Sequence, residues 1–136
     1  EPVKKSFKKL CYFANVRYLG NKSSDEYMNY IMGFDVGIML FKISKLTLTY
    51  SPYKMYDYIA AGIPIVSTPI PEVLRFKDVI EIASTPDEYI SAIEKSLLKN
   101  SQALRSKYMR IIESENWDCR AKVAIDLIDG ILKTKT

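Results

Sequence analysis

The segment SPYKMYDYIAAGIPIVST, residues 51–68, constrains the fold of this chain more than any other stretch. Ser51 is a favourable N-cap, Pro52 suits the first position of a helix, and Gly62 suits the left-handed conformation in which many helices end. These signals predict a helix over residues 52–61. The proline that follows Gly62 by two positions prevents the helix from continuing, and the apolar residues after it predict a short buried strand.

The predicted helix has one apolar face and one face that can meet a ligand. Met55, Tyr58 and Ile59 share a face at helical spacing. Free backbone N–H groups in the first turn of a helix attract anions, Lys54 adds positive charge, and the Asp57 carboxylate can accept hydrogen bonds from ribose hydroxyls. This combination suits a nucleoside diphosphate. These residues leave open a second interpretation, a capped amphipathic helix whose Lys54 and Asp57 form an ion pair at the surface.

The same segment, extended to Val73, resembles the donor-binding segment of GT-B glycosyltransferases of family 4. Members of that family commonly carry the run Pro-x-Lys-x-aromatic-Glu-Tyr-x-Ala-Ala-Gly-x-Pro-Val-Val-x-Thr. The similarity continues upstream through residues 15–20 (NVRYLG) and 34–40 (FDVGIML), and downstream through residues 78–89 (DVIEIASTPDEY). Because it covers nearly all of the chain in the same order, we treat it as specific.

The resemblance implies that the chain binds a nucleotide-sugar donor, a UDP- or GDP-sugar, as part of a glycosyltransferase in polysaccharide biosynthesis. Such enzymes transfer the sugar to a glycan or lipid-linked acceptor with retention, and they need no metal or other cofactor. A helix N-terminus and basic side chains stabilise the departing diphosphate instead. On this basis we assign Ser51 and the amides of Tyr53 and Lys54 to the phosphates, Asp57 to the ribose, and residues 69–72 to the rim. We assign no catalytic residue.

Three departures from the family pattern limit what the resemblance implies. The family's donor-binding domain begins with two further strands and a Gly-rich loop, and an acceptor domain precedes it. We therefore expect residues 1–136 to be a single, N-terminally truncated donor-binding domain that transfers no sugar alone. The family's Glu-x7-Glu motif falls on Thr49 and Asp57, and the preceding loop lacks Gly-Phe-Gly, which leaves the donor open. A degenerate or non-catalytic α/β nucleotide-binding or interaction module is the alternative.

Composition excludes several classes of site. The sequence has no histidine, which removes Ser-His and Cys-His nucleophiles and imidazole metal sites. Cys11 and Cys119 are far apart and have no companion ligands, which fits a reduced, cytoplasmic setting without a zinc site. A net charge of +4 without a dense basic stripe argues against nucleic-acid binding. The lysines near the N-terminus leave peripheral contact with the inner face of a membrane as an alternative to plain solvation.

The alternation of strands and helices predicts an α/β fold. We expect a partial Rossmann-like domain of about four parallel strands, with helices on both faces and a helical C-terminus. Ligands bind such sheets at the carboxyl ends of the strands. The first predicted strand, Asn15–Leu19, lacks the two neighbours that the family gives it. We expect it to pair with residues 36–40 or, alternatively, to join a second copy of the chain in a homodimer.

Caps, apolar spacing and turn residues predict the other elements, with Ser23 or Ser24 capping one helix and residues 85–88 capping another. Residues 41–50 are favoured as a loop, with a strand or hairpin as the alternative. Trp117 is expected to be a core anchor, with a ligand platform as the alternative, at the start of a helix that resembles the family's crossover helix. The predicted helices cover residues 3–13, 23–32, 72–76, 85–98, 104–115 and 117 onward, and the predicted strands cover residues 15–19, 35–40, 65–66 and 79–83.

Overall fold

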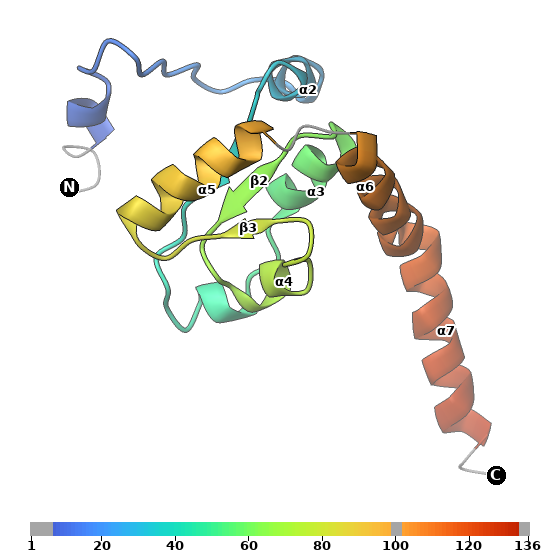
Figure 1. The fold of residues 1–136 in the computed structure, drawn as a ribbon. Coiled ribbons are helices and arrows are strands. Elements are labelled where there is room, and N and C mark those ends of the chain that lie inside the picture. Colours follow the sequence, from blue (N-terminus) through green and yellow to red (C-terminus); the bar gives the residue numbers. More distant parts are fainter. Residues whose placement is uncertain (1–6, 99–101, 134–136) are drawn as a thin grey trace.

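A small parallel sheet forms the centre of the molecule (Figure 1). The structure is a computed structural model that describes residues 7–98 and 102–133. Within these residues the sheet has three strands in the order β1-β2-β3, so the predicted α/β class is confirmed with three strands in place of about four. The strands are β1 (Gly37–Met39), β2 (Ile65–Ser67) and β3 (Glu81–Ile82).

Helices surround the sheet and form the C-terminal part of the chain. Apart from the predicted helix over residues 3–13 and the predicted strand Asn15–Leu19, the predicted helices and strands lie close to their expected positions, with ends that differ by a few residues. Residues 41–50 form a loop, as favoured, that contains one 3-10 turn. The helical elements are α2 (Ser24–Met32), η1 (Thr47–Thr49), α3 (Tyr53–Ala60), α4 (Pro71–Leu74), α5 (Pro86–Leu98), α6 (Gln102–Glu115) and α7 (Trp117–Lys133).

The central strand β2 is buried on both sides, as is usual in a parallel sheet. Ile65 packs into the larger core cluster together with Met55 and Ile59 of α3. Val66 points to the opposite face and packs with Ala92 of α5 in a smaller cluster. The sheet therefore carries helices on both faces, as predicted, and Figure 1 shows α5 lying across one of them.

Helix α3 begins one residue later than predicted. Pro52 has an extended backbone (φ −78°, ψ 108°) and occupies the N-cap position, and no side chain of the described residues caps the helix. The prediction of Ser51 as the N-cap is wrong because Ser51 lies one position before the cap residue, where its hydroxyl does not reach the first-turn amides. Gly62 has φ 73° and follows the helix in the left-handed conformation, as predicted.

The sheet and α3 approach each other closely at Gly37 of β1. A Cβ atom placed on Gly37 would lie 2.5 Å from Cδ2 of Tyr58, a buried side chain of α3. That separation is too short for any real side-chain carbon. The position of α3 over β1 therefore depends on a glycine at this point.

Helices α2 and α5 are capped by their own side chains, as predicted. In α2 the Ser23 hydroxyl accepts a bond from the Glu26 amide (3.4 Å), and the Glu26 carboxylate accepts one from the Ser23 amide (3.3 Å). In α5 the Thr85 hydroxyl accepts a bond from the Glu88 amide (3.3 Å). The Glu88 carboxylate accepts bonds from the amides of Ser84 (2.6 Å) and Thr85 (3.3 Å). Both helix starts are capping boxes.

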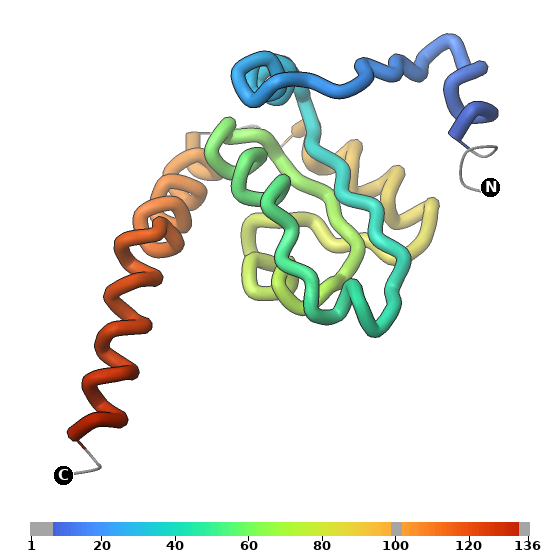
Figure 2. Tube along the Cα trace, turned by 180° about the vertical axis from the view of Figure 1, so that it is seen from behind, coloured from blue at the N-terminus to red at the C-terminus, as the bar shows by residue number. Residues whose placement is uncertain are grey.

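The predicted strand Asn15–Leu19 is wrong. The segment has no strand structure and is exposed except at half-buried Val16, and β1 pairs with β2 alone in the described part of the chain. Figures 1 and 2 show the segment running away from the sheet. A strand forms only beside another strand that bonds its backbone N–H and C=O groups. The described part of the chain has no such strand beside residues 15–19. Of the helix predicted over residues 3–13, residues 7–10 are helical and residues 1–6 lie outside the described range.

The C-terminal part is helical, as predicted, and α7 extends away from the sheet (Figures 1 and 2). Asn116 caps α7, because its side-chain oxygen accepts a bond from the Cys119 amide at 2.9 Å. The prediction of Trp117 as a core anchor is wrong, since its side chain is 79% exposed at the point where α7 leaves the body. None of the helices in residues 7–98 and 102–133 has the length and apolar character required to cross a bilayer.

Candidate functional site

A pocket of about 450 Å³ lies beside the first two turns of α3, and we name it the α3 pocket. One wall is a single face of α3, because its residues recur at spacings of three and four. The opposite wall comes from the end of α6 and the start of α7. The lining residues are Ser51, Tyr53, Tyr56, Asp57 and Ala60 on the α3 side, and Ile112, Glu115, Asn116, Trp117 and Arg120 on the other.

Three of the four residues predicted to bind a donor line this pocket. Ser51 and Tyr53 are exposed at the start of α3, and Asp57 is half-buried one turn further along. Lys54 is exposed on α3 but does not line the pocket. The structure therefore brings Ser51, Tyr53 and Asp57 together and leaves Lys54 outside the cavity.

The Asp57 carboxylate is held from α2. Tyr27 donates its hydroxyl hydrogen to Asp57 Oδ2 at 3.1 Å. Burial, together with this hydrogen bond, raises the pKa of Tyr27, so the phenol remains a donor at neutral pH. The alternative of a surface ion pair between Lys54 and Asp57 is wrong, because these two described residues form none and Asp57 is bound by Tyr27 instead.

The start of α3 presents backbone donors near this pocket. Because α3 connects two parallel strands, it runs antiparallel to them and begins at the carboxyl end of the sheet. The first amides of a helix have no partner within the helix, and no side chain caps those of α3. The helix macrodipole adds partial positive charge at the same end. This end of the pocket therefore favours an anion.

A closed ring of hydrogen bonds supports the opposite wall, and we name it the Tyr56 ring. Tyr56 donates to Glu72 Oε1 (2.8 Å), which also accepts from Arg75 Nη1 (2.8 Å). Arg75 Nη2 donates to Glu115 Oε1 (2.6 Å), and Arg120 Nη2 donates to Glu115 Oε2 (2.9 Å). Arg120 Nη2 also donates to the Tyr56 hydroxyl oxygen (2.9 Å) and closes the ring. The ring joins α3, α6 and α7 to the end of α4.

The ring also sets the protonation of its members. Burial, together with the bond to Glu72, raises the pKa of Tyr56 to about 12. The hydrogen bond to Glu72 raises the pKa of Arg75 as well. Tyr56 therefore keeps its hydroxyl hydrogen at neutral pH and donates it to Glu72 while accepting from Arg120.

A second pocket, of about 600 Å³, lies at the carboxyl ends of the strands, and we name it the carboxyl-edge pocket. Tyr89 lines this pocket. Its hydroxyl donates to the Met39 carbonyl oxygen (3.0 Å) and lies 2.8 Å from the Thr68 hydroxyl oxygen. Pro69 lines this pocket, whereas Glu72 belongs to the Tyr56 ring, so the predicted rim divides between two places. The lining residues, none of them charged, are Leu40, Phe41, Ile43, Thr68, Pro69, Ser84, Thr85, Pro86, Tyr89 and Ile90.

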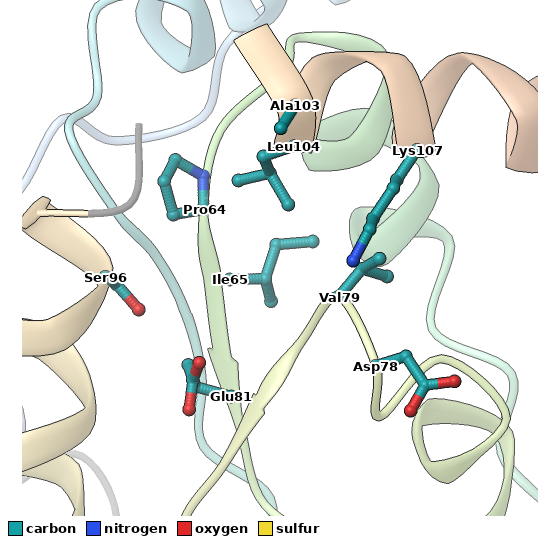
Figure 3. Close-up of a pocket in the computed structure, with 9 residues that line it drawn as sticks. All are labelled: Pro64, Ile65, Asp78, Val79, Glu81, Ser96, Ala103, Leu104 and Lys107. Carbon is teal, nitrogen blue, oxygen red and sulfur yellow. The ribbon is translucent and has the colours of Figure 1, made fainter. Parts of the chain in front are cut away.

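A third cavity, of about 180 Å³, lies at the amino ends of β2 and β3, and we name it the amino-edge cavity (Figure 3). Ser96 of α5 and Lys107 of α6 enter it from opposite sides. The Ser96 hydroxyl is buried and has no hydrogen-bond partner within residues 7–98 and 102–133. Ligand pockets of α/β sheets lie at the other ends of the strands and are usually ~300 Å³ or larger. Of the three cavities, the α3 pocket therefore best combines adequate size with charged and aromatic lining.

The sequence assigned to the donor no residue of the wall opposite α3, and it missed two residues on the α3 side. Tyr56 and Ala60 were within reach, because they continue the helical face of Tyr53 and Asp57. Trp117 was considered as a ligand platform but expected in the core, and Arg120 gave no local signal. Only the packing of α6 against α3, and of α7 against α6, brings both residues to the pocket.

One curated protein is similar to this chain, the "Putative teichuronic acid biosynthesis glycosyltransferase TuaH" of Bacillus subtilis (strain 168). The two are 29% identical over 120 residues, which cover 84% of this chain and 30% of that protein. The chain thus spans under a third of the length of this relative. No protein-family model matches the chain, and no solved structure matches it. The similarity to the TuaH protein supports a relationship between this chain and glycosyltransferases.

Proposed function

We propose that this chain is the donor-binding part of a glycosyltransferase and holds the nucleoside diphosphate of a UDP- or GDP-sugar in the α3 pocket. One observation carries the proposal: Ser51, Tyr53 and Asp57, assigned to the donor from the family resemblance, line a single pocket at an uncapped helix start. Similarity to a protein named as a glycosyltransferase supports the reaction class. The pocket volume of about 450 Å³ lies within the range of small-molecule sites.

Each part of the ligand meets suitable chemistry in this proposal. The phosphates meet the free amides of Tyr53 and Lys54 and the Ser51 hydroxyl, where the α3 macrodipole favours negative charge. The Asp57 carboxylate, oriented by Tyr27, accepts bonds from the ribose hydroxyls. The Lys54 side chain lies outside the cavity, where it raises the local positive potential without contact.

The partial positive charge at the start of α3 also assists the transfer of the sugar in this proposal. When the bond between the sugar and the diphosphate breaks, negative charge develops on the departing diphosphate. The N-terminus of α3 stabilises that charge without a metal ion. The sugar passes with retention to a glycan or lipid-linked acceptor, which a separate part of the complete enzyme holds. The proposal assigns no catalytic residue to this chain.

A second candidate function is nucleotide binding without transfer. Thr49 stands where the resembled family has an acid, and its hydroxyl donates to the Leu46 carbonyl oxygen (3.0 Å) within its own turn. Such a residue has no charge to offer a sugar. Transfer by the complete protein from a common UDP- or GDP-sugar would reject this second candidate, whereas binding without any transfer would favour it.

Nuclear magnetic resonance of the 15N-labelled chain tests the site. Titration with UDP and GDP should shift the amide signals of Tyr53, Lys54 and Asp57 and leave those of Ser96 and Lys107 in the amino-edge cavity unchanged. Binding by the chain alone is expected to be weak, roughly millimolar. Shifts confined to the carboxyl-edge pocket or the amino-edge cavity, or no shifts at millimolar nucleotide, would overturn the assignment.

A further inference from the structure

Trp117 is an exposed aromatic side chain on the wall of the α3 pocket. It is the only tryptophan of the sequence, and 79% of its surface is open. Tyr53, across the pocket on α3, is 75% exposed. Tryptophan is highly buried on average, because its large ring gains much from leaving water. The exposed face of the Trp117 indole on the pocket wall is therefore available for stacking.

The backbone position from which this indole projects is set by its neighbours in the sequence. Asn116 immediately before it caps α7 through the Cys119 amide, so Trp117 stands at the first helical position. Arg120, one turn further along, donates to both Glu115 and Tyr56 in the Tyr56 ring. Asn116 also donates to the Glu113 carbonyl oxygen of α6 (2.9 Å), so the backbone is tied to α6 before Trp117 and, through Arg120, to α3 and α6 after it. Only the two side-chain torsions of the indole remain to be ordered when a ligand covers it.

We propose that Trp117 is the platform on which the nucleobase of the donor stacks, which rests on the function proposed above. The amides at the start of α3 suit phosphate, and the Asp57 carboxylate suits ribose hydroxyls. Neither group suits the flat, uncharged base. The Trp117 ring has a π face that stacks on any base, purine or pyrimidine. The pocket therefore offers one group for each part of a nucleoside diphosphate.

The single tryptophan makes the proposal directly measurable. Intrinsic fluorescence of the chain, excited at the indole and corrected for nucleotide absorbance, reports on Trp117 alone. UDP or GDP should quench or shift this emission, and so should the nucleosides uridine or guanosine at higher concentration. Inorganic pyrophosphate has no base, so it should compete with UDP without changing the emission by itself.

Variants separate stacking from a structural role. Trp117→Leu should raise the Kd for UDP or GDP roughly 5- to 150-fold, as expected when base stacking is lost, and leave pyrophosphate binding unchanged. Trp117→Phe keeps a ring and should restore most of the affinity. Tyr12→Leu is the matched control, because Tyr12 is an aromatic side chain with 85% exposure outside the pocket. This control should bind like the parent chain.

The outcomes distinguish this inference from the function on which it rests. Calorimetric binding of UDP or GDP with no change in Trp117 emission, and with equal affinity for Trp117→Leu, would overturn the stacking role and leave the proposed function standing. Equal losses of UDP and pyrophosphate affinity in Trp117→Leu would also overturn it, because they indicate a structural effect. Absence of any nucleotide binding to the parent chain would overturn the proposed function and this inference together.

Discussion

The starts of α3 and α5 are similar in place but differ in how their first amides are satisfied. Both helices follow a strand, begin at the carboxyl end of the sheet and have a proline in the first turn or at the cap. Thr85 and Glu88 form a complete capping box on α5. No side chain caps α3.

The difference separates a helix start that stabilises the fold from one that is open to a ligand. Capping by Thr85 and Glu88 satisfies donors of α5 internally, so an anion gains little there. The amides of Tyr53 and Lys54 at the start of α3 receive no cap from a described side chain and lie next to Asp57 and a pocket of suitable size. If this comparison is correct, changes at α5 affect stability and changes at α3 affect binding.

The largest effect is expected at Gly37 of β1, because α3 lies in close contact with the sheet at this residue. Gly37→Ala places a Cβ atom 2.5 Å from the Tyr58 ring, so α3 must shift away from β1. We expect a loss of about 1–3 kcal/mol or more in the free energy of unfolding, together with weaker nucleotide binding. Urea denaturation measures the first and calorimetry the second. Gly33→Ala is the control, because its Cβ atom would meet the Tyr30 carbonyl oxygen at an ordinary 3.5 Å.

The next effect is on binding through Asp57. Asp57→Ala should weaken UDP or GDP binding by about 1–3 kcal/mol, because it removes hydrogen bonds to a charged acceptor. Tyr27→Phe removes the bond that orients this carboxylate and should weaken binding by a smaller amount. Calorimetry on the complete protein is the measurement. Equal affinity of Asp57→Ala and the parent would show that Asp57 is a surface acid without a ligand.

A matched pair of hydroxyl deletions tests the comparison most directly. Thr85→Ala should lower the free energy of unfolding by about 0.5–2 kcal/mol and leave nucleotide affinity unchanged, because it removes a cap. Ser51→Ala should leave stability within about 0.5 kcal/mol, because Ser51 caps nothing, and weaken nucleotide binding by about 0.5–1.5 kcal/mol. Chemical denaturation and calorimetry on both variants give the four values. A reversed pattern would refute the distinction between the two helix starts.

The smallest effect is a pH dependence from the Tyr56 ring. The folded-state pKa of Tyr56 is raised from 10.0 to about 12, so the folded chain holds this proton more tightly than the unfolded chain does. The resulting stability is fully present below pH 10 and is lost as pH rises through about 12. Tyr56→Phe should therefore lose less stability over this interval than the parent. If the denaturation midpoints of the parent and Tyr56→Phe fall equally as the pH rises, the Tyr56 ring does not contribute to the pH dependence of stability.

Local signals predicted the helix starts well where a side chain acts on its own helix. Ser23 with Glu26 and Thr85 with Glu88 are readable as Ser/Thr-x-x-Glu, and both boxes form. Ser51 gave a weaker signal, a serine before a proline with Lys54 in place of the glutamate, and the predicted cap does not form. The extended Pro52 takes the cap position, which sequence preference alone does not resolve within one residue.

Features that depend on distant segments could not be predicted. Residues 15–19 have an acceptable strand pattern, but no strand lies beside them to pair with. Trp117 was expected in the core because large rings are usually buried, whereas the departure of α7 from the body leaves it open. The Tyr56 ring joins residues far apart in the sequence, such as Tyr56 and Arg120, so no spacing rule reveals it.

The unpartnered Ser96 hydroxyl marks a place where thermostability could be engineered without touching the α3 pocket. The buried Ser96 hydroxyl has no protein hydrogen-bond partner among the described residues, so its removal breaks no bond within the protein. Alanine removes that group and is also the better residue inside a helix. Ser96→Ala should thus raise the melting temperature and lengthen the useful life of the chain in the nucleotide titrations, which makes it a convenient background for every other variant.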